Sequence, residues 1–315
     1  MRHRSPEPQF ESRIHVPQPH GLQHAVRHAD GTATGVWGPF EIRSAFQPIF
    51  RIGPDERLFP AAYEGLVRPF RDYRAVSPYD FFRLVPPESR FEVEGLLRAV
   101  HLLNAASFLP AEADIFLNFD PSVIVDEAAA VQTIRDLKLV LEETAIPPRR
   151  IVCEMTEQPA DSVTDLANFA EALRGGGFRI AVDDYGADES DAARVRALRP
   201  DIVKFDGKWA NYLLNSRPGM ALLQNMVSGF REKGIVTVFE GIEFGYQLDL
   251  AVQAGTAMVQ GFALARPQLA TAQFSPFPMP EGAREATLAA VPVEPKPQQP
   301  ADHTGSRPFG RRNAS

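Results

Sequence analysis

The chain has 315 residues, a net charge of −7, 44% hydrophobic residues and one cysteine, Cys153. This length fits one large domain or two small ones, and a lone cysteine excludes both a disulfide framework and a cysteine-based zinc site. No apolar run approaches the roughly 18–20 residues that span a bilayer, and the polar start MRHRSPEPQF does not resemble a secretory signal. We therefore expect no membrane insertion and a cytoplasmic location.

The charge is distributed unevenly. Residues 1–40 carry four arginines and three acids, and residues 276–315 carry five basic and four acidic residues, which leaves −9 for residues 41–275. This acidic body argues against a nucleic-acid polymer as partner, because phosphate binding relies on Lys and Arg. Five of the seven histidines lie in the first 28 residues, and eight prolines lie in the last forty. We expect disordered tails at 1–40 and 276–315, with metal binding by the first tail or docking of a protein partner as less favoured alternatives.

Residues 41–275 alternate short runs rich in Val, Ile and Phe with longer amphipathic stretches. The predicted strands are Ala45–Phe50, Ala61–Val67, Asp114–Phe119, Ile151–Met155, Phe178–Asp183, Ile202–Phe205, Ile235–Phe239 and Ala257–Gln260. The predicted helices are Phe91–Ser107, Ala128–Glu143, Val163–Arg174, Trp209–Lys233 and Phe244–Gln253. Eight strands alternating with helices favour an α/β protein of the (β/α)₈ TIM-like barrel type. A doubly wound open sheet is the alternative, but no G-x-G-x-x-G turn follows the first strand.

Polar residues lie at or near the carboxyl ends of these apolar strands. Barrels of this type have their reactive groups at those ends. In chain order they are Glu64, Asn118, Glu154, Asp183 with Asp184, Lys204, Glu240 and Gln260. Their neighbours are apolar, so a solvated face explains them poorly. A structural ion-pair network is the alternative to a reactive site.

Carboxylates that converge on one barrel mouth repel each other unless cations lie between them. Oxygen donors favour Mg²⁺ or Mn²⁺ over zinc, and the adjacent Asp183 and Asp184 suit a site with two metal ions. Lys204 adds a charge that can hold an attacking water or a phosphate oxygen, so the set predicts metal-assisted phosphoester hydrolysis. A Schiff base on Lys204 is a weaker alternative, because the surrounding acids raise its pKa.

The ordered motifs QPIF, YEGLVRP, NFDP, CEMTE, DDYG, VKFD, FEGIE and VQGFALARP resemble the EAL domain, a bacterial phosphodiesterase of cyclic diguanylate. The resemblance covers about residues 43–267. It implies a (β/α)₈-like barrel with one antiparallel strand, two Mg²⁺ or Mn²⁺ ions in each active site, and conversion of cyclic di-GMP (c-di-GMP) to linear pGpG. It also implies a homodimer.

The same resemblance implies a role for each matching residue. The implied metal ligands are Glu64, Asn118, Glu154, Asp183, Asp184 and Glu240. Lys204 resembles the lysine that positions the nucleophilic water, and it forms the catalytic set with Glu64 and Glu240. The implied substrate-pocket residues are Gln47, Arg68 and Gln260, and Glu157 corresponds to the acid that braces the loop after the fifth strand.

The sequence departs from the family pattern outside the ligand positions. Gly65 stands where the family usually has alanine, and Asp188 stands where it normally has a second glycine. The second change affects the loop after the fifth strand, so a weak or silent domain that acts as a c-di-GMP receptor, or as a protein-interaction module, is the alternative function. The lone helical His101 is interpreted as a structural histidine and Cys153 as a small buried apolar residue.

Overall fold

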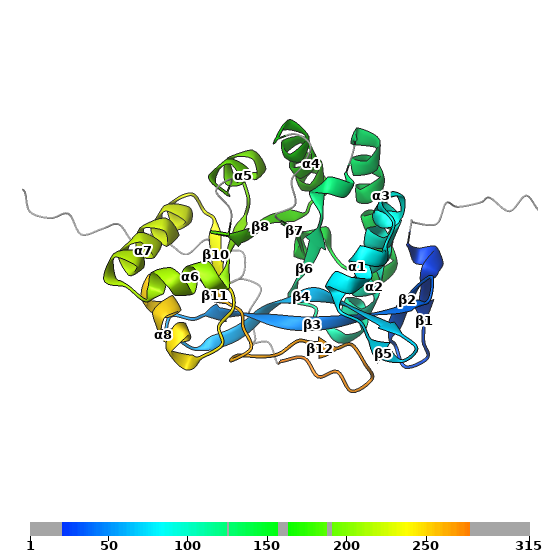
Figure 1. The fold of residues 1–315 in the computed structure, drawn as a ribbon, viewed down its shortest axis with the longest axis horizontal. Coiled ribbons are helices and arrows are strands. Elements are labelled where there is room, and N and C mark those ends of the chain that lie inside the picture. The colour runs from blue at the N-terminus through cyan, green and yellow to red at the C-terminus, as the bar shows by residue number, and fades with distance from the viewer. Residues whose placement is uncertain (1–20, 125, 157–162, 188–190, 278–315) are drawn as a thin grey trace, which may run out of the picture.

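The computed structural model describes residues 21–124, 126–156, 163–187 and 191–277. Within these residues eight strands close into a barrel, because β3 pairs with both β4 and β11 at the two ends of the series. The barrel strands are β3 (Phe40–Ile52), β4 (Leu58–Arg71), β6 (Asp114–Phe119), β7 (Ile151–Met155), β8 (Arg179–Tyr185), β9 (Ile202–Phe205), β10 (Val236–Phe239) and β11 (Met258–Val259). The predicted barrel is confirmed; helices lie outside its parallel strands, and the segment that holds β12 (Gln268–Leu269) runs along β3 (Figure 1).

One barrel strand runs against the others. β3 is antiparallel to both of its barrel neighbours, whereas the pairs from β4 through β6, β7, β8, β9 and β10 to β11 are all parallel. Only residues 53–57 separate β3 from β4, and a connection this short joins antiparallel strands. The single antiparallel strand that the resemblance implied is therefore present. The carboxyl ends of the seven parallel strands meet at one mouth of the barrel.

The five predicted helices are present in the predicted order, one of them divided in two, and the short helices Pro78–Leu84 and Asp191–Leu198 were not predicted. The helices are α1 (Pro78–Leu84), α2 (Arg90–Phe108), α3 (Glu127–Thr144), α4 (Val163–Gly175), α5 (Asp191–Leu198), α6 (Gly207–Leu214), α7 (Arg217–Glu232) and α8 (Gly245–Ala254), with 3₁₀ turns at Leu22–His24, Pro87–Ser89, Pro121–Val123 and Pro148–Arg150. The predicted helix over 209–233 breaks at Ser216, whose hydroxyl accepts a hydrogen bond from the backbone N–H of Gly219. Pro218 lies in the first turn of α7, where its missing N–H costs nothing.

The prediction of a disordered tail at 1–40 is wrong for residues 21–40. Strands β1 (Ala25–Arg27) and β2 (Ala33–Trp37) form a hairpin that extends the sheet from β3. The buried Asn104 of α2 accepts a hydrogen bond from the N–H of Ala33 and donates one to its carbonyl oxygen. This long-range pairing has no local sequence signal. Residues 1–20 lie outside the described residues, and their disorder stays a prediction.

The outer face of β3 and β4 is covered by the chain that follows the barrel. Strand β12 (Gln268–Leu269) pairs with β3. The short β5 (Arg74–Ala75) lies instead directly after β4, with which it pairs. Phe274 packs edge-to-face on Phe46, and the backbone N–H of Phe277 donates to the hydroxyl of Tyr63. The ordered body thus reaches residue 277, two residues beyond the predicted boundary at 275. Residues 278–315 lie outside the described residues.

Two apolar layers hold the site in place. Small and medium side chains fill the barrel below the mouth, among them Ile49, Ala62, Val152 and Met258. A larger cluster packs between the strands and the helices and includes Cys153, which is fully buried as predicted. This alternation leaves every second residue near a strand end directed into the barrel. No helix in the described ranges is both long enough and apolar enough to cross a membrane.

Candidate metal-binding active site

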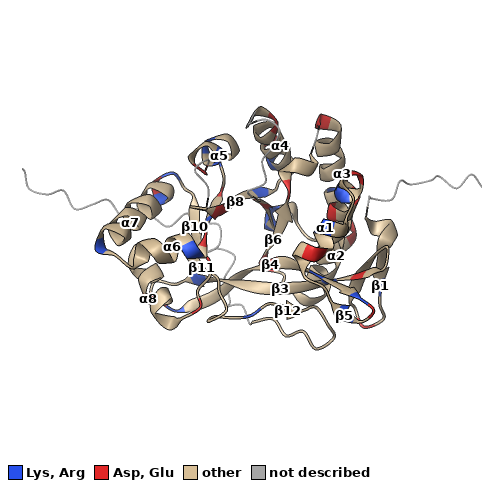
Figure 2. Ribbon diagram, viewed as in Figure 1, with Lys and Arg blue, Asp and Glu red and all other residues tan. Residues whose placement is uncertain are grey.

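Lys204 of β9 lies inside the barrel mouth and is surrounded by carboxylates from four other strands or strand ends. Its Nζ lies 2.5 Å from Oε1 of Glu154, 2.6 Å from Oε1 of Glu240 and 3.0 Å from Oδ1 of Asp183. Oε2 of Glu64 is 3.9 Å away. Residues far apart in sequence converge here because parallel strands end at the same mouth. Figure 2 shows acidic and basic positions along the ribbon inside the ring of helices as well as on the helices.

The cluster has more negative charge than its lysine compensates. Burial alone lowers the pKa of Lys204, but the surrounding carboxylates raise this pKa well above its ordinary value. Burial raises the pKa of Glu154 well above its ordinary value and that of Glu240 to about 8, and neighbouring carboxylates add to both shifts. Lys204 is thus held charged, which disfavours the Schiff-base alternative.

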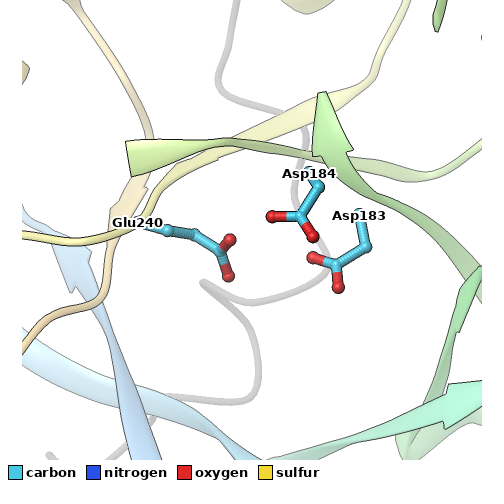
Figure 3. Close-up of side chains that lie close together, drawn as sticks. All are labelled: Asp183, Asp184 and Glu240. Carbon is cyan, nitrogen blue, oxygen red and sulfur yellow. The ribbon is translucent and has the colours of Figure 1, made fainter. Parts of the chain in front are cut away.

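Asp183 and Asp184 share this mouth through an irregularity in β8. Successive residues of a regular strand point to opposite faces of a sheet. Here the pairing of β8 with β9 shifts between Val182 and Tyr185, and Asp184 adopts a left-handed conformation with φ of 52°. As a result, oxygen atoms of Asp183, Asp184 and Glu240 lie within 4.8 Å of one another and the three carboxylates face one another (Figure 3).

Amide side chains orient Glu64 from two sides. Nε2 of Gln260 donates a hydrogen bond of 2.7 Å to Oε2 of Glu64, and Nδ2 of Asn118 lies 3.4 Å from Oε1. Gln47 lies opposite Glu64 in the β3–β4 register, but its amide N–H donates instead to the carbonyl oxygen of Ala265 at 3.2 Å. Gln47 therefore ties the loop after β11 to the barrel.

The donor set fits a hard divalent cation. Four buried oxygen atoms accept no hydrogen bond in the described structure: both carboxylate oxygens of Glu154, Oδ1 of Asp183 and Oε1 of Gln260. Glu154 and Asp183 do form ion pairs with Lys204. Buried carboxylate and amide oxygens without donors are high in energy unless a cation neutralises them. Carboxylate and amide oxygens are the ligands that Mg²⁺, Mn²⁺ and Ca²⁺ take in proteins.

A cavity of about 530 Å³ opens beside Glu64 between β4, α1 and α2. Its walls are formed partly by apolar side chains and partly by four arginines and two acids; the charged residues are Arg68, Arg83, Arg90, Arg98, Glu94 and Asp120. Asn118 also lines it, so the cavity adjoins the carboxylate cluster. A space with apolar walls and excess positive charge suits an aromatic anion such as a nucleotide.

The buried pair Glu94–Arg98 was missed in the sequence. Nη1 of Arg98 lies 3.1 Å from Oε2 of Glu94, one helical turn apart, and both residues are almost completely buried. The sequence did contain a signal for this pair, because two opposite charges lie four residues apart on an otherwise apolar helix face. Two other predicted residues, Glu157 and Asp188, lie outside the described residues, so their predicted roles stay predictions.

A mixed (β/α)₈ barrel with a divalent-cation site at the mouth is the class of protein that the fold and the site define. The chain belongs to the EAL domain family, whose match spans residues 40–267. This span begins at the first residue of β3 and ends just before β12, so it covers the whole barrel.

Two relatives named as phosphodiesterases are similar over part of their length. "Probable cyclic di-GMP phosphodiesterase PdeA" of Escherichia coli is 27% identical over 220 residues, which are 69% of this chain and 28% of PdeA. Cyclic di-GMP phosphodiesterase PdeB of Shewanella oneidensis is 31% identical over 129 residues, which are 41% of this chain and 13% of PdeB. The chain thus spans well under half of either relative.

Solved structures share the fold. The EAL-domain protein YkuI of Bacillus subtilis, in complex with c-di-GMP and calcium, superimposes with a TM-score of 0.63 at 24% identity over 78% of this chain and 59% of that chain. BlrP1 of Klebsiella pneumoniae, with manganese and c-di-GMP, gives 0.63 at 22% identity over 81% of this chain and 62% of that chain. At this identity the likeness establishes the barrel and leaves the activity to be argued from the site.

Proposed function

We propose that the chain hydrolyses c-di-GMP to linear pGpG with two Mg²⁺ or Mn²⁺ ions in its active site. One observation carries the proposal: a buried lysine inside a ring of carboxylates, next to a cavity suited to a nucleotide. The names of the relatives PdeA and PdeB support the same substrate.

Each residue of the cluster has a proposed task. The metal ligands are Glu64, Asn118, Glu154, Asp183, Asp184 and Glu240. Two bound cations would activate a water molecule and stabilise the oxygen that leaves phosphorus. Lys204 Nζ, held charged by its neighbours, donates a hydrogen bond that orients the attacking water. Glu64 and Glu240 complete the catalytic set.

The remaining pocket residues bind and orient the substrate. The Arg68 guanidinium, which lines the cavity, donates to a phosphate oxygen. Gln260 holds Glu64 in position and Gln47 anchors the neighbouring loop. In the reaction, the water oxygen bonds to phosphorus, the bond from phosphorus to the 3′ oxygen breaks, and that oxygen leaves with a proton as the free hydroxyl of pGpG.

The disorder of residues 1–20 and 278–315, the homodimer, the cytoplasmic location and a protein partner for the tails stay predictions. Glu157 is proposed to support the loop after β8, as the family resemblance implies. The alternative function is a receptor that binds c-di-GMP without hydrolysing it, which the sequence favours through Asp188 in that loop.

The test is a turnover assay on the full chain with Mg²⁺ or Mn²⁺ and c-di-GMP, in which chromatography follows pGpG. We expect Glu64→Ala to abolish pGpG formation and Glu142→Ala, an exposed change on α3, to leave it unchanged. Binding of c-di-GMP without any pGpG would contradict the enzyme proposal and establish the receptor. Absence of both binding and turnover would contradict both.

A further inference from the structure

The imidazole of His101 occupies space that Gly65 leaves free. Gly65 follows Glu64 in β4, and a Cβ atom at this position would lie 3.1 Å from Cγ of His101 on α2. That separation is closer than most real Cβ contacts, so a side chain here would push the imidazole aside. Gly65 is thus matched to a histidine 36 positions further along the chain.

The hydrogen-bond network behind the imidazole fixes which of its nitrogens carries the proton. Oγ of the buried Ser44 lies 2.8 Å from Nδ1 of His101, and Nδ2 of Asn104 lies 3.2 Å from the same Oγ. Asn104 is oriented by Ala33, so its Nδ2 offers hydrogen atoms only. The Ser44 proton therefore goes to Nδ1 of His101, because a buried hydroxyl needs an acceptor.

It follows that the proton of the neutral imidazole sits on Nε2. Burial, with the charges of Arg68 and Arg98 adding to it, lowers the pKa of His101 to about 3, so the ring is neutral. His101 lines the cavity beside Arg68, and no described residue hydrogen-bonds to Nε2. An uncharged imidazole, with its proton on Nε2, therefore lines the cavity together with the cationic guanidinium of Arg68.

The walls near this donor suit a flat base. Leu66, Phe82 and Leu97 line the same cavity. Guanine presents two acceptors, O6 and N7, along one edge, whereas adenine presents N7 and an N6 amino donor. N7 accepts a hydrogen bond in both bases, so the group at position 6 distinguishes them: a fixed N–H donor aimed there is favourable against guanine O6 and unfavourable against the adenine amino group. Sites built this way discriminate by leaving a buried polar group unpaired.

We propose that His101, through Nε2–H, is a specificity-determining residue that donates to O6 of a guanine base in this cavity, and that Gly65 provides the space it needs. The inference rests on the proposed function, since it assumes a guanine dinucleotide as ligand. Ser44 and Asn104 act as positioning residues that set the tautomer.

The test compares binding of c-di-GMP and of c-di-AMP, which share the phosphate and ribose groups and differ only in the base. Calorimetry on the full chain uses Ca²⁺, the ion present with c-di-GMP in the YkuI structure. The variants are His101→Leu, which removes the donor, and His101→Gln, whose amide can also donate. The surface change His24→Leu is the matched control, because His24 pairs with Glu92 and does not line the cavity.

We expect His101→Leu to weaken c-di-GMP binding roughly tenfold and c-di-AMP binding less than about twofold, with His101→Gln in between. Gly65→Ala should weaken c-di-GMP binding when it is the single change. In the double variant with His101→Leu it should have no further effect on binding. If His101→Leu does not fold, His101→Gln and Gly65→Ala carry the same comparison.

Equal losses for both dinucleotides would overturn base reading, because the contact would then be to a shared group. Unchanged c-di-GMP affinity in His101→Leu would overturn it as well. If discrimination between the bases depends on His101 but the chain forms no pGpG, this inference is supported and only the enzyme proposal is contradicted. A wild-type chain that binds neither dinucleotide would overturn both.

Discussion

Replacing Lys204 by methionine isolates the role of its charge. Methionine keeps most of the side-chain length and volume but leaves the carboxylates of Glu64, Glu154, Asp183 and Glu240 without their common partner. Removing one partner of a buried ion pair costs about 3–5 kcal/mol. For a domain of this size that corresponds to a fall in Tm of roughly 10 °C.

The assay is thermal unfolding followed by circular dichroism in EDTA, and then in increasing Mg²⁺ or Mn²⁺. We expect Lys204→Met to unfold well below the wild type in EDTA. Added cation should raise its Tm more than it raises that of the wild type, because the cation then supplies the missing positive charge. Lys208→Met, an exposed change four residues along, is the matched control.

Two results would refute this reasoning. Equal Tm values for Lys204→Met and Lys208→Met in EDTA would mean that the lysine does not compensate the buried carboxylates. A cation-induced gain in Tm no larger than that of the wild type would mean that the bound cation does not take over the charge of Lys204. Loss of activity alone would not distinguish these cases, so stability is the measured quantity.

Three further predictions follow from other parts of the fold. Gly186→Ala should lower the free energy of unfolding by about 3 kcal/mol, because Gly186 has φ of 107° and a Cβ atom there would lie 2.3 Å from the Trp209 ring. Burial raises the pKa of Glu94 from 4.5 to about 7, so its protonated form stabilises the fold below about pH 4.5 and this contribution is lost as the pH rises through 7. Glu94→Gln should therefore reduce the loss of unfolding free energy between pH 5 and pH 8 by up to about 3 kcal/mol in urea titrations. Phe277→Ala should cost about 3 kcal/mol in the same assay, because its ring packs on Phe50.

Each of these predictions has a matched control in the chain. Gly229→Ala lies in α7 with open space around it, and we expect it to be neutral or slightly stabilising. Glu142→Gln and Phe262→Ala change exposed side chains of the same types. A Gly186→Ala chain as stable as Gly229→Ala, a pH slope unchanged by Glu94→Gln, or equal stability of Phe277→Ala and Phe262→Ala would contradict the corresponding prediction.

Much of the barrel was predictable because its signals are local. Each strand is marked by an apolar run of strand length with a polar residue at its end. These signals lie within short segments, so each can be recognised without knowing which strand lies beside it. The predicted strands Ile151–Met155, Ile202–Phe205 and Asp114–Phe119 have the observed bounds. The hairpin β1–β2 was missed because Ala33 and Gly35 pack against Asn104 and Leu96 of α2, about 60–70 residues away in sequence.

By itself, then, the sequence determined the strand order, the residue types at the mouth and the excess of acids, since these depend only on periodicity and composition. Tertiary structure decided which of these groups touch. The bulge in β8 turns Asp184 to the side of Asp183, and four carboxylates from separate strands share one lysine. The same holds for His101, whose role changes from an isolated helical histidine to an oriented donor because Gly65 and Ser44 lie beside it only in the folded barrel.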